Sequence, residues 1–123
     1  MTRILVIALG GALGALARYG ATLLVGAYWK RDFPLATFLI NVSGAFILGL
    51  FLTFAAERAS LDASWRLFVA TGFLGSYTTF STFEFETQRL AEGGALRLAL
   101  LNVIASVTVG FVAVQLGVLL ARR

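Results

Sequence analysis

Residues 72–86 read Gly-Phe-Leu-Gly-Ser-Tyr-Thr-Thr-Phe-Ser-Thr-Phe-Glu-Phe-Glu. The stretch begins as an apolar, membrane-spanning run, then fills with glycines, hydroxyls and phenylalanines, and ends on two carboxylates. A bilayer offers no water to backbone N–H and C=O groups. Irregular backbone is therefore tolerated at that depth only where protein buries it or where it lines a cavity or an ion site. We predict a broken helix that forms the working part of a small transport protein.

The rest of the chain predicts an all-α membrane protein. Its 123 residues are 59% hydrophobic and only 13% charged, which is too apolar for an ordinary soluble domain. About 20 apolar residues cross a hydrocarbon core roughly 30 Å thick. We predict a single transmembrane domain over residues 1–123, with four spans at about 4–29, 35–56, 66–90 and 97–121. We therefore predict a multi-pass protein of the cell (inner) membrane.

Missing residue types narrow the chemistry. The chain has no Cys and no His, so it lacks thiolate metal ligands, disulfides and the usual near-neutral base. Glu84 and Glu86 lie two apart on a helix and point to different faces. We therefore predict that the protein is not an enzyme. The net charge of +4 comes from basic residues that flank the spans singly or in pairs, which is typical of interfacial anchors and does not indicate nucleic-acid binding.

Small residues and helix signals predict how the spans pack and end. Gly10 and Gly14 have the GxxxG spacing that permits close helix approach. Ser60 or Asp62 is expected to cap the third span, and Gly93-Gly94 to end it. In the fourth span one face carries a small and polar seam, which is either a packing seam or also a pore lining: Asn102, Ser106, Gly110, Ala113 and Gly117.

The loop charges give little bias in orientation. Four spans put five basic residues on the side of the termini and four on the other: Arg3, Arg58, Arg66, Arg122 and Arg123 against Lys30, Arg31, Arg89 and Arg97. The positive-inside rule depends on such asymmetry. A chain with so small a difference is able to insert both ways, and an antiparallel two-fold homodimer is then a natural assembly.

Two phenylalanines follow the predicted break. Phe80 and Phe83 lie three apart and stack on neighbouring turns. A phenyl ring is positive at its edge, so rings presented edge-on can stabilise a small anion without holding it too tightly. The alternative is that the pair simply faces lipid or core.

Polar residues add candidate anion donors. Asn41 lies in the middle of an uncharged span, and its NH₂ group either donates to an anion or makes an interhelical hydrogen bond. Thr37 lies one turn earlier on the same face, and Ser81 and Thr82 add hydroxyls beside the phenylalanines.

Arg18 lies some 14 residues into the first span and cannot easily reach either membrane surface. It either pairs with a carboxylate such as Glu86 or supplies positive potential along an anion route. Glu86 is alternatively a solvated vestibule residue.

These motifs together resemble those of the small fluoride channel (Fluc) family over essentially the whole chain. The matching strings are residues 10–19 (Gly-Gly-Ala-Leu-Gly-Ala-Leu-Ala-Arg-Tyr), residues 41–44 (Asn-Val-Ser-Gly), residues 72–75 (Gly-Phe-Leu-Gly) and residues 78–83 (Thr-Thr-Phe-Ser-Thr-Phe). The resemblance implies an antiparallel homodimer with two pores. It also implies passive export of fluoride down its gradient, which reduces fluoride toxicity in the cell.

The resemblance also assigns residues. Phe80 and Phe83 match the family's pore-lining aromatics, and Asn41 matches its pore asparagine. Gly75 and Thr78 match the positions whose backbone carbonyls hold a structural, untransported Na⁺ on the dimer axis. Ser106 matches a serine of a polar track in the fourth span. Gly110 departs from the pattern because a hydroxyl is expected there.

Two other functions are compatible with four spans. A proton-coupled exporter of organic cations needs a buried carboxylate, yet spans one, two and four contain no Asp or Glu. A non-transporting assembly subunit explains the small-residue seams but not the broken helix with its Phe and hydroxyl pattern.

Overall fold

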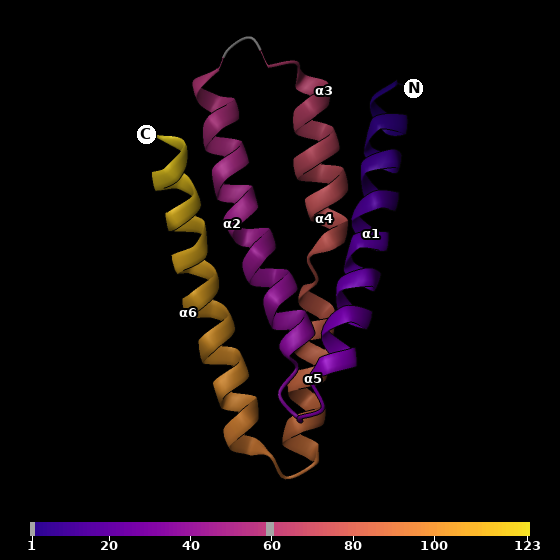
Figure 1. The fold of residues 1–123 in the computed structure, drawn as a ribbon, viewed down its shortest axis with the longest axis vertical. Coiled ribbons are helices and arrows are strands. Elements are labelled where there is room, and N and C mark those ends of the chain that lie inside the picture. The colour runs from indigo at the N-terminus through magenta and orange to yellow at the C-terminus, as the bar shows by residue number, and fades with distance from the viewer. Residues whose placement is uncertain (1, 59–60) are drawn as a thin grey trace.

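The computed structural model describes residues 2–58 and 61–123 and consists of helices joined by short connections (Figure 1). Three helices are continuous, and each is long and apolar enough to cross a membrane: α1 (Thr2–Tyr28), α2 (Leu35–Glu57) and α6 (Leu96–Ala121). The residues described contain no strand. The predicted all-α class is confirmed.

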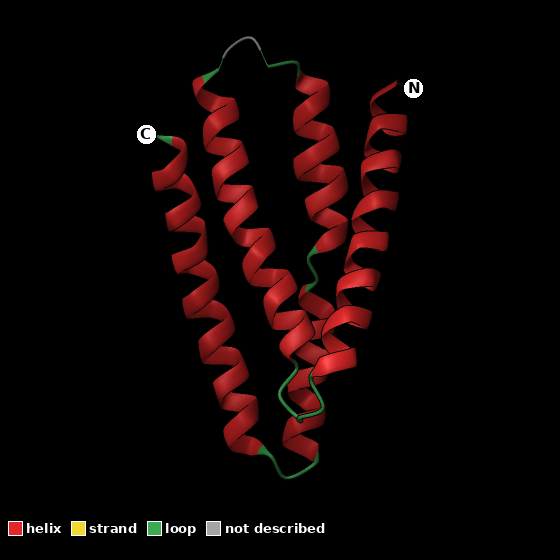
Figure 2. Ribbon diagram, in the orientation of Figure 1, coloured by secondary structure: helices red, strands yellow, loops and turns green. Residues whose placement is uncertain are grey.

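The third span is divided into pieces (Figure 2). It comprises α3 (Ala63–Arg66), the π-helix η1 (Leu67–Leu74), α4 (Gly75–Tyr77) and α5 (Phe80–Glu92). A π-helix has wider turns than an α-helix. At the end of η1 the Gly75 N–H accordingly donates to the carbonyl of Ala70, five residues earlier. Between α4 and α5 the backbone is extended, and this confirms the predicted break in the third span.

The helices run up and down as a bundle. The start of α1, the end of α6, the end of α2 and the start of α3 lie at one end, and the α1–α2 and α5–α6 connections lie at the other (Figure 1). Helix α6 packs along α2, while α1 packs along η1 and α4. This arrangement is the one on which the count of basic residues on each side is based.

Glycines let these helix pairs approach closely. A Cβ atom at Gly10 would collide with the backbone oxygen of Phe68, and one at Gly14 with that of Phe73. The predicted GxxxG contact is thus confirmed, with η1 as its partner. On α6, Gly117 meets the backbone of Phe46 in α2 in the same way. Part of the fourth-span seam is therefore a packing surface.

The ends of the third span follow the sequence signals. The Asp62 side chain accepts from the Ser64 N–H at 3.2 Å and caps α3, while Ser60 lies outside the described residues. At the other end Gly94 has φ +80°, and the Ala95 N–H donates to the carbonyl of Leu90 at 2.8 Å. This is the Schellman arrangement that glycine makes possible. The Asp62 cap and the Gly93-Gly94 terminus are both confirmed.

Candidate functional site

The centre of the site is the helix break, where α2 replaces the missing helical bonds. Thr78 (φ −79°, ψ 157°) and Thr79 (φ −152°, ψ 115°) are extended. The Asn41 amide in α2 bonds both backbone groups of Thr79: its Nδ2 donates to the Thr79 carbonyl at 2.9 Å, and its Oδ1 accepts from the Thr79 N–H at 2.8 Å. The interhelical alternative for Asn41 is therefore present in the structure. The NH₂ group keeps a second proton for another acceptor.

Thr79 also begins the next helix. Its hydroxyl accepts from the Thr82 N–H at 3.3 Å and donates to the Thr82 hydroxyl at 2.8 Å, so it caps α5. The Thr82 hydroxyl thus already accepts one hydrogen bond from the capping residue. Ser81, which follows directly after Phe80, is exposed on the surface of the described chain.

The break removes the ordinary helical partners of several carbonyls, among them those of Gly75 and Thr78. In a continuous helix the Gly75 carbonyl would accept from the Thr79 N–H, and the Thr78 carbonyl from the Thr82 N–H. Those two N–H groups instead bond the side chains of Asn41 and Thr79. Gly75 is exposed on the surface of the described chain, whereas Thr78 is partly buried. Carbonyl oxygens are hard ligands that suit a hard cation.

A groove of about 590 Å³ runs past the break and gathers most of the predicted site residues. Asn41, Phe80, Phe83 and Ser106 line it together with Gly75 and Thr78. Phe80 is 73% exposed, whereas Phe83 is 7% exposed, and their ring centroids lie 5.8 Å apart at an angle of 46°. Ser81 and Thr82 are not among the lining residues. The structure thus brings four of the predicted pathway side chains to one surface and leaves these two beside it.

The groove has an open place at Gly110. A Cβ atom there would meet nothing within 4 Å, and Gly110 also lines the groove one turn beyond Ser106. The neighbouring lining residues Val107, Phe111 and Val114 are apolar. The polar lining contributed by α6 therefore ends at Ser106.

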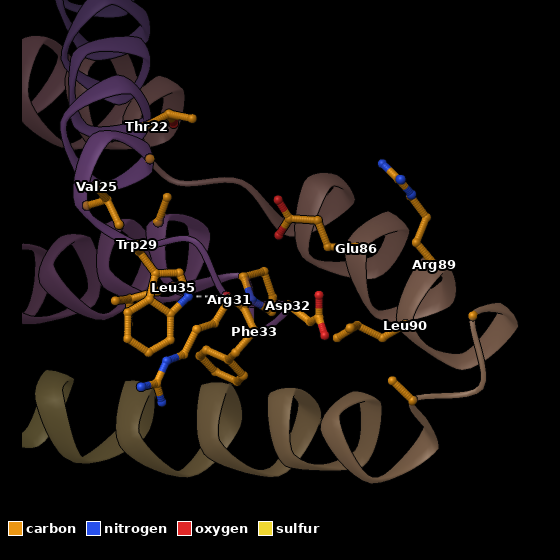
Figure 3. Close-up of a pocket in the computed structure, with 15 residues that line it drawn as sticks. Thr22, Val25, Trp29, Arg31, Asp32, Phe33, Leu35, Glu86, Arg89 and Leu90 are labelled. Carbon is orange, nitrogen blue, oxygen red and sulfur yellow. Dashed lines mark hydrogen bonds between the residues drawn. The ribbon is translucent and has the colours of Figure 1, made fainter.

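A second hollow, of about 560 Å³, lies between the α1–α2 turn and α5 (Figure 3). Arg31, Asp32 and Arg89 line it, and the Glu86 carboxylate points into it (Figure 3). The Thr37 hydroxyl donates to Glu86 Oε1 at 2.9 Å, while Oε2 is buried without a hydrogen-bond partner among the described residues.

Glu86 thus bonds Thr37, and neither of its oxygens bonds Arg18. The predicted Arg18–Glu86 pair is absent from the described part of the chain, because α2 supplies the partner that Arg18 was expected to provide. Positive potential along an anion route remains as the other prediction for Arg18.

A buried chain of polar side chains lies behind the groove, and the sequence predicted only part of it. Asn102, which is 1% exposed, bonds Ser106 in its own helix and Thr87 in α5. The four-residue spacing of Asn102 and Ser106 identified the seam. Thr87 carried no signal, because helical periodicity gives the face of a residue but not its partner on another helix.

The chain matches known proteins over nearly its whole length. Residues 5–118 match the family described as CrcB-like protein, Camphor Resistance (CrcB). A protein of Solibacter usitatus named fluoride-specific ion channel FluC is 47% identical over 119 residues, which cover 97% of this chain and 98% of that protein. Proteins of the same name from Acidobacterium capsulatum and Synechocystis sp. are 47% and 46% identical, covering 95% and 97% of this chain and 94% and 92% of theirs. The family resemblance of the sequence motifs is confirmed, and the chain belongs to the CrcB-like protein family.

Proposed function

We propose that this protein is a fluoride-specific ion channel that lets fluoride leave the cell down its gradient and so reduces fluoride toxicity. The observation that carries the proposal is the groove, where Asn41, Phe80, Phe83 and Ser106 meet at a helix break braced by α2. The names of the full-length relatives support the same function. The protein is a multi-pass membrane protein and not an enzyme.

The groove and the hollow suggest a route. Glu86 lies in the hollow, and Phe83, one turn earlier on α5, lines the groove. An ion would pass from the hollow by Thr37 to Asn41 and Phe83, and then to Phe80 and Ser106. Fluoride is strongly hydrated, so the pathway must replace water with several modest donors that still allow release. Ring edges, the second Asn41 proton and hydroxyls meet that need.

The experiment is efflux from liposomes that contain the pure protein. Fluoride efflux should be rapid and chloride efflux small, and an organic cation should not cross. Absence of fluoride flux from a correctly folded sample would reject the proposed function. Proton-coupled movement of the organic cation would instead support the exporter alternative.

We propose further that the channel is an antiparallel homodimer with both orientations in the membrane. The groove opens on the surface of the chain, and Phe80 at its edge is 73% exposed, so a second copy is needed to enclose it. The five-to-four split of basic residues supports dual insertion. Reporter fusions at the C-terminus should give signals on both sides of the membrane. A signal on one side alone would refute dual topology.

The freed carbonyls of Gly75 and Thr78 fit a structural Na⁺ at the dimer axis. Two carbonyls from each copy would supply four hard ligands, and the ion would supply positive charge that holds the four oxygens together. An ion bound only by the folded dimer stabilises it by mass action. Replacing Na⁺ with a bulky organic cation should therefore weaken the dimer. Unchanged dimer stability, with no Na⁺ retained by the protein, would reject this site.

A further inference from the structure

A chain of hydrogen bonds joins α6 to α5 behind the groove. Ser106 Oγ lies 3.3 Å from Asn102 Oδ1, and Asn102 Nδ2 lies 2.9 Å from Thr87 Oγ1. Thr87 Oγ1 in turn lies 2.8 Å from the carbonyl oxygen of Phe83. Ser106 and Phe83 line the groove, whereas the buried Asn102 does not.

The direction of every bond in this chain is fixed from its far end. A threonine hydroxyl has one proton, and that of Thr87 is donated to the Phe83 carbonyl. Thr87 Oγ1 can therefore only accept from Asn102, so the amide NH₂ faces Thr87 and the amide oxygen faces Ser106. Ser106 must then donate its own proton to Asn102.

We propose that Asn102 is a positioning residue that holds the Ser106 proton away from the groove until an anion displaces it. The inference rests on the proposed fluoride pathway. Without an anion, Ser106 turns lone pairs to the groove; when fluoride arrives, its hydroxyl rotates and donates to the ion. The Ser106–Asn102 distance of 3.3 Å is longer than the usual O–H···O distance of about 2.7–2.8 Å, so the bond is easily exchanged.

This competition tunes how strongly the site holds its ion. A hydroxyl that must give up a neighbouring acceptor gains less from binding fluoride than a free hydroxyl does. A net hydrogen bond of typical strength corresponds to about two- to tenfold in an equilibrium constant. Asn102 thus weakens fluoride binding at Ser106 by that factor, and faster release follows.

The test is the concentration dependence of fluoride flux through the full-length protein in liposomes. Asn102→Leu keeps the size of the side chain but removes the acceptor. It should lower the half-saturating fluoride concentration about two- to tenfold and reduce the maximal flux. The same substitution in a Ser106→Ala background should produce no shift, because no hydroxyl remains to be released.

Two further variants separate positioning from general structural damage. Asn102→Leu leaves Thr87 without its donor, so Asn102→Leu with Thr87→Val removes both partners at once and should give the same shift. Ser43→Ala removes another interhelical hydrogen bond, to Tyr77 at 3.0 Å, and should leave the half-saturating concentration unchanged.

The outcomes divide cleanly. An unchanged or raised half-saturating concentration in both Asn102 variants would overturn the inference, as would a shift that persists in the Ser106→Ala background. In either case the parent protein would still carry fluoride, and the proposed function would stand. Absence of fluoride flux in the parent would instead remove the proposed function and this inference together.

Discussion

Replacing Asn41 with leucine should both weaken the fold and stop fluoride. The substitution keeps the size of the side chain but removes two hydrogen bonds to Thr79, of 2.9 and 2.8 Å. Interhelical bonds in membranes average about 0.6 kcal/mol each, with a maximum of about 1.7. Their loss should lower the free energy of unfolding by about 1–3 kcal/mol, because Thr79 then has an unpaired N–H and C=O at membrane depth.

Asn41→Asp separates the two halves of the contact. One carboxylate oxygen can still accept from the Thr79 N–H, but the other then faces the Thr79 carbonyl without a proton to donate. We expect a loss of stability at least as large as that of the leucine variant. Fluoride efflux should also be abolished, because a carboxylate replaces the NH₂ donor that the proposed route uses at Asn41.

The assay is unfolding by a denaturing detergent in micelles, followed by efflux from liposomes. Ser43→Ala is the matched control, since Ser43 lies on the same helix and bonds Tyr77 instead of the broken segment. It should cost less than about 1 kcal/mol and leave efflux intact. If Asn41→Leu has the stability of the parent, Asn41 does not support the break and the reasoning is refuted.

Two other predictions use matched pairs in the same assays. Gly14→Ala should lower the free energy of unfolding by about 1–3 kcal/mol, because its Cβ would collide with the Phe73 backbone. Gly20→Ala, whose Cβ would meet nothing within 4 Å, should raise that free energy by up to about 1 kcal/mol. Equal effects of the two substitutions on unfolding would contradict the helix contact. Phe80→Ile and Phe83→Ile should both lose fluoride efflux, and Phe83→Ile should lower the free energy of unfolding more, because Phe83 is buried within its own chain whereas Phe80 is exposed on it. Parent-like efflux through both variants would argue against the aromatic edges.

Much of this architecture could be predicted from local signals. Apolar length predicted the three long continuous helices, the Gly10–Gly14 spacing predicted a close helix contact, and the hydroxyl-rich string after Gly75 predicted the break. Each of these depends on residues that are neighbours in the sequence, so their physical cause is visible in the sequence itself.

Other features depend on partners or on backbone geometry that the sequence does not display. Asn41 bonds Thr79 across 38 positions, and Asn102 bonds Thr87 across 15. The orientation of Ser81 depends on the rotation of α5 after two extended residues, and η1 has wider turns than the ordinary helical period assumes. For these reasons the sequence predicted the Asn41 amide and the Ser81 hydroxyl as donors, but not that Thr79 would engage the first or that the second would lie outside the groove.

The two hydrogen bonds between Asn41 and Thr79 also make the order in which the helices are synthesised important. A ribosome adds about 5–20 residues each second, so α2 is complete seconds before the broken span leaves the exit tunnel. The helix that bonds the Thr79 backbone is therefore already synthesised when that backbone leaves the ribosome. A permuted chain with α3–α5 made first would place unpaired N–H and C=O groups in lipid with no shield yet available. Chain order thus makes the partner of the Thr79 backbone available before that backbone meets the lipid.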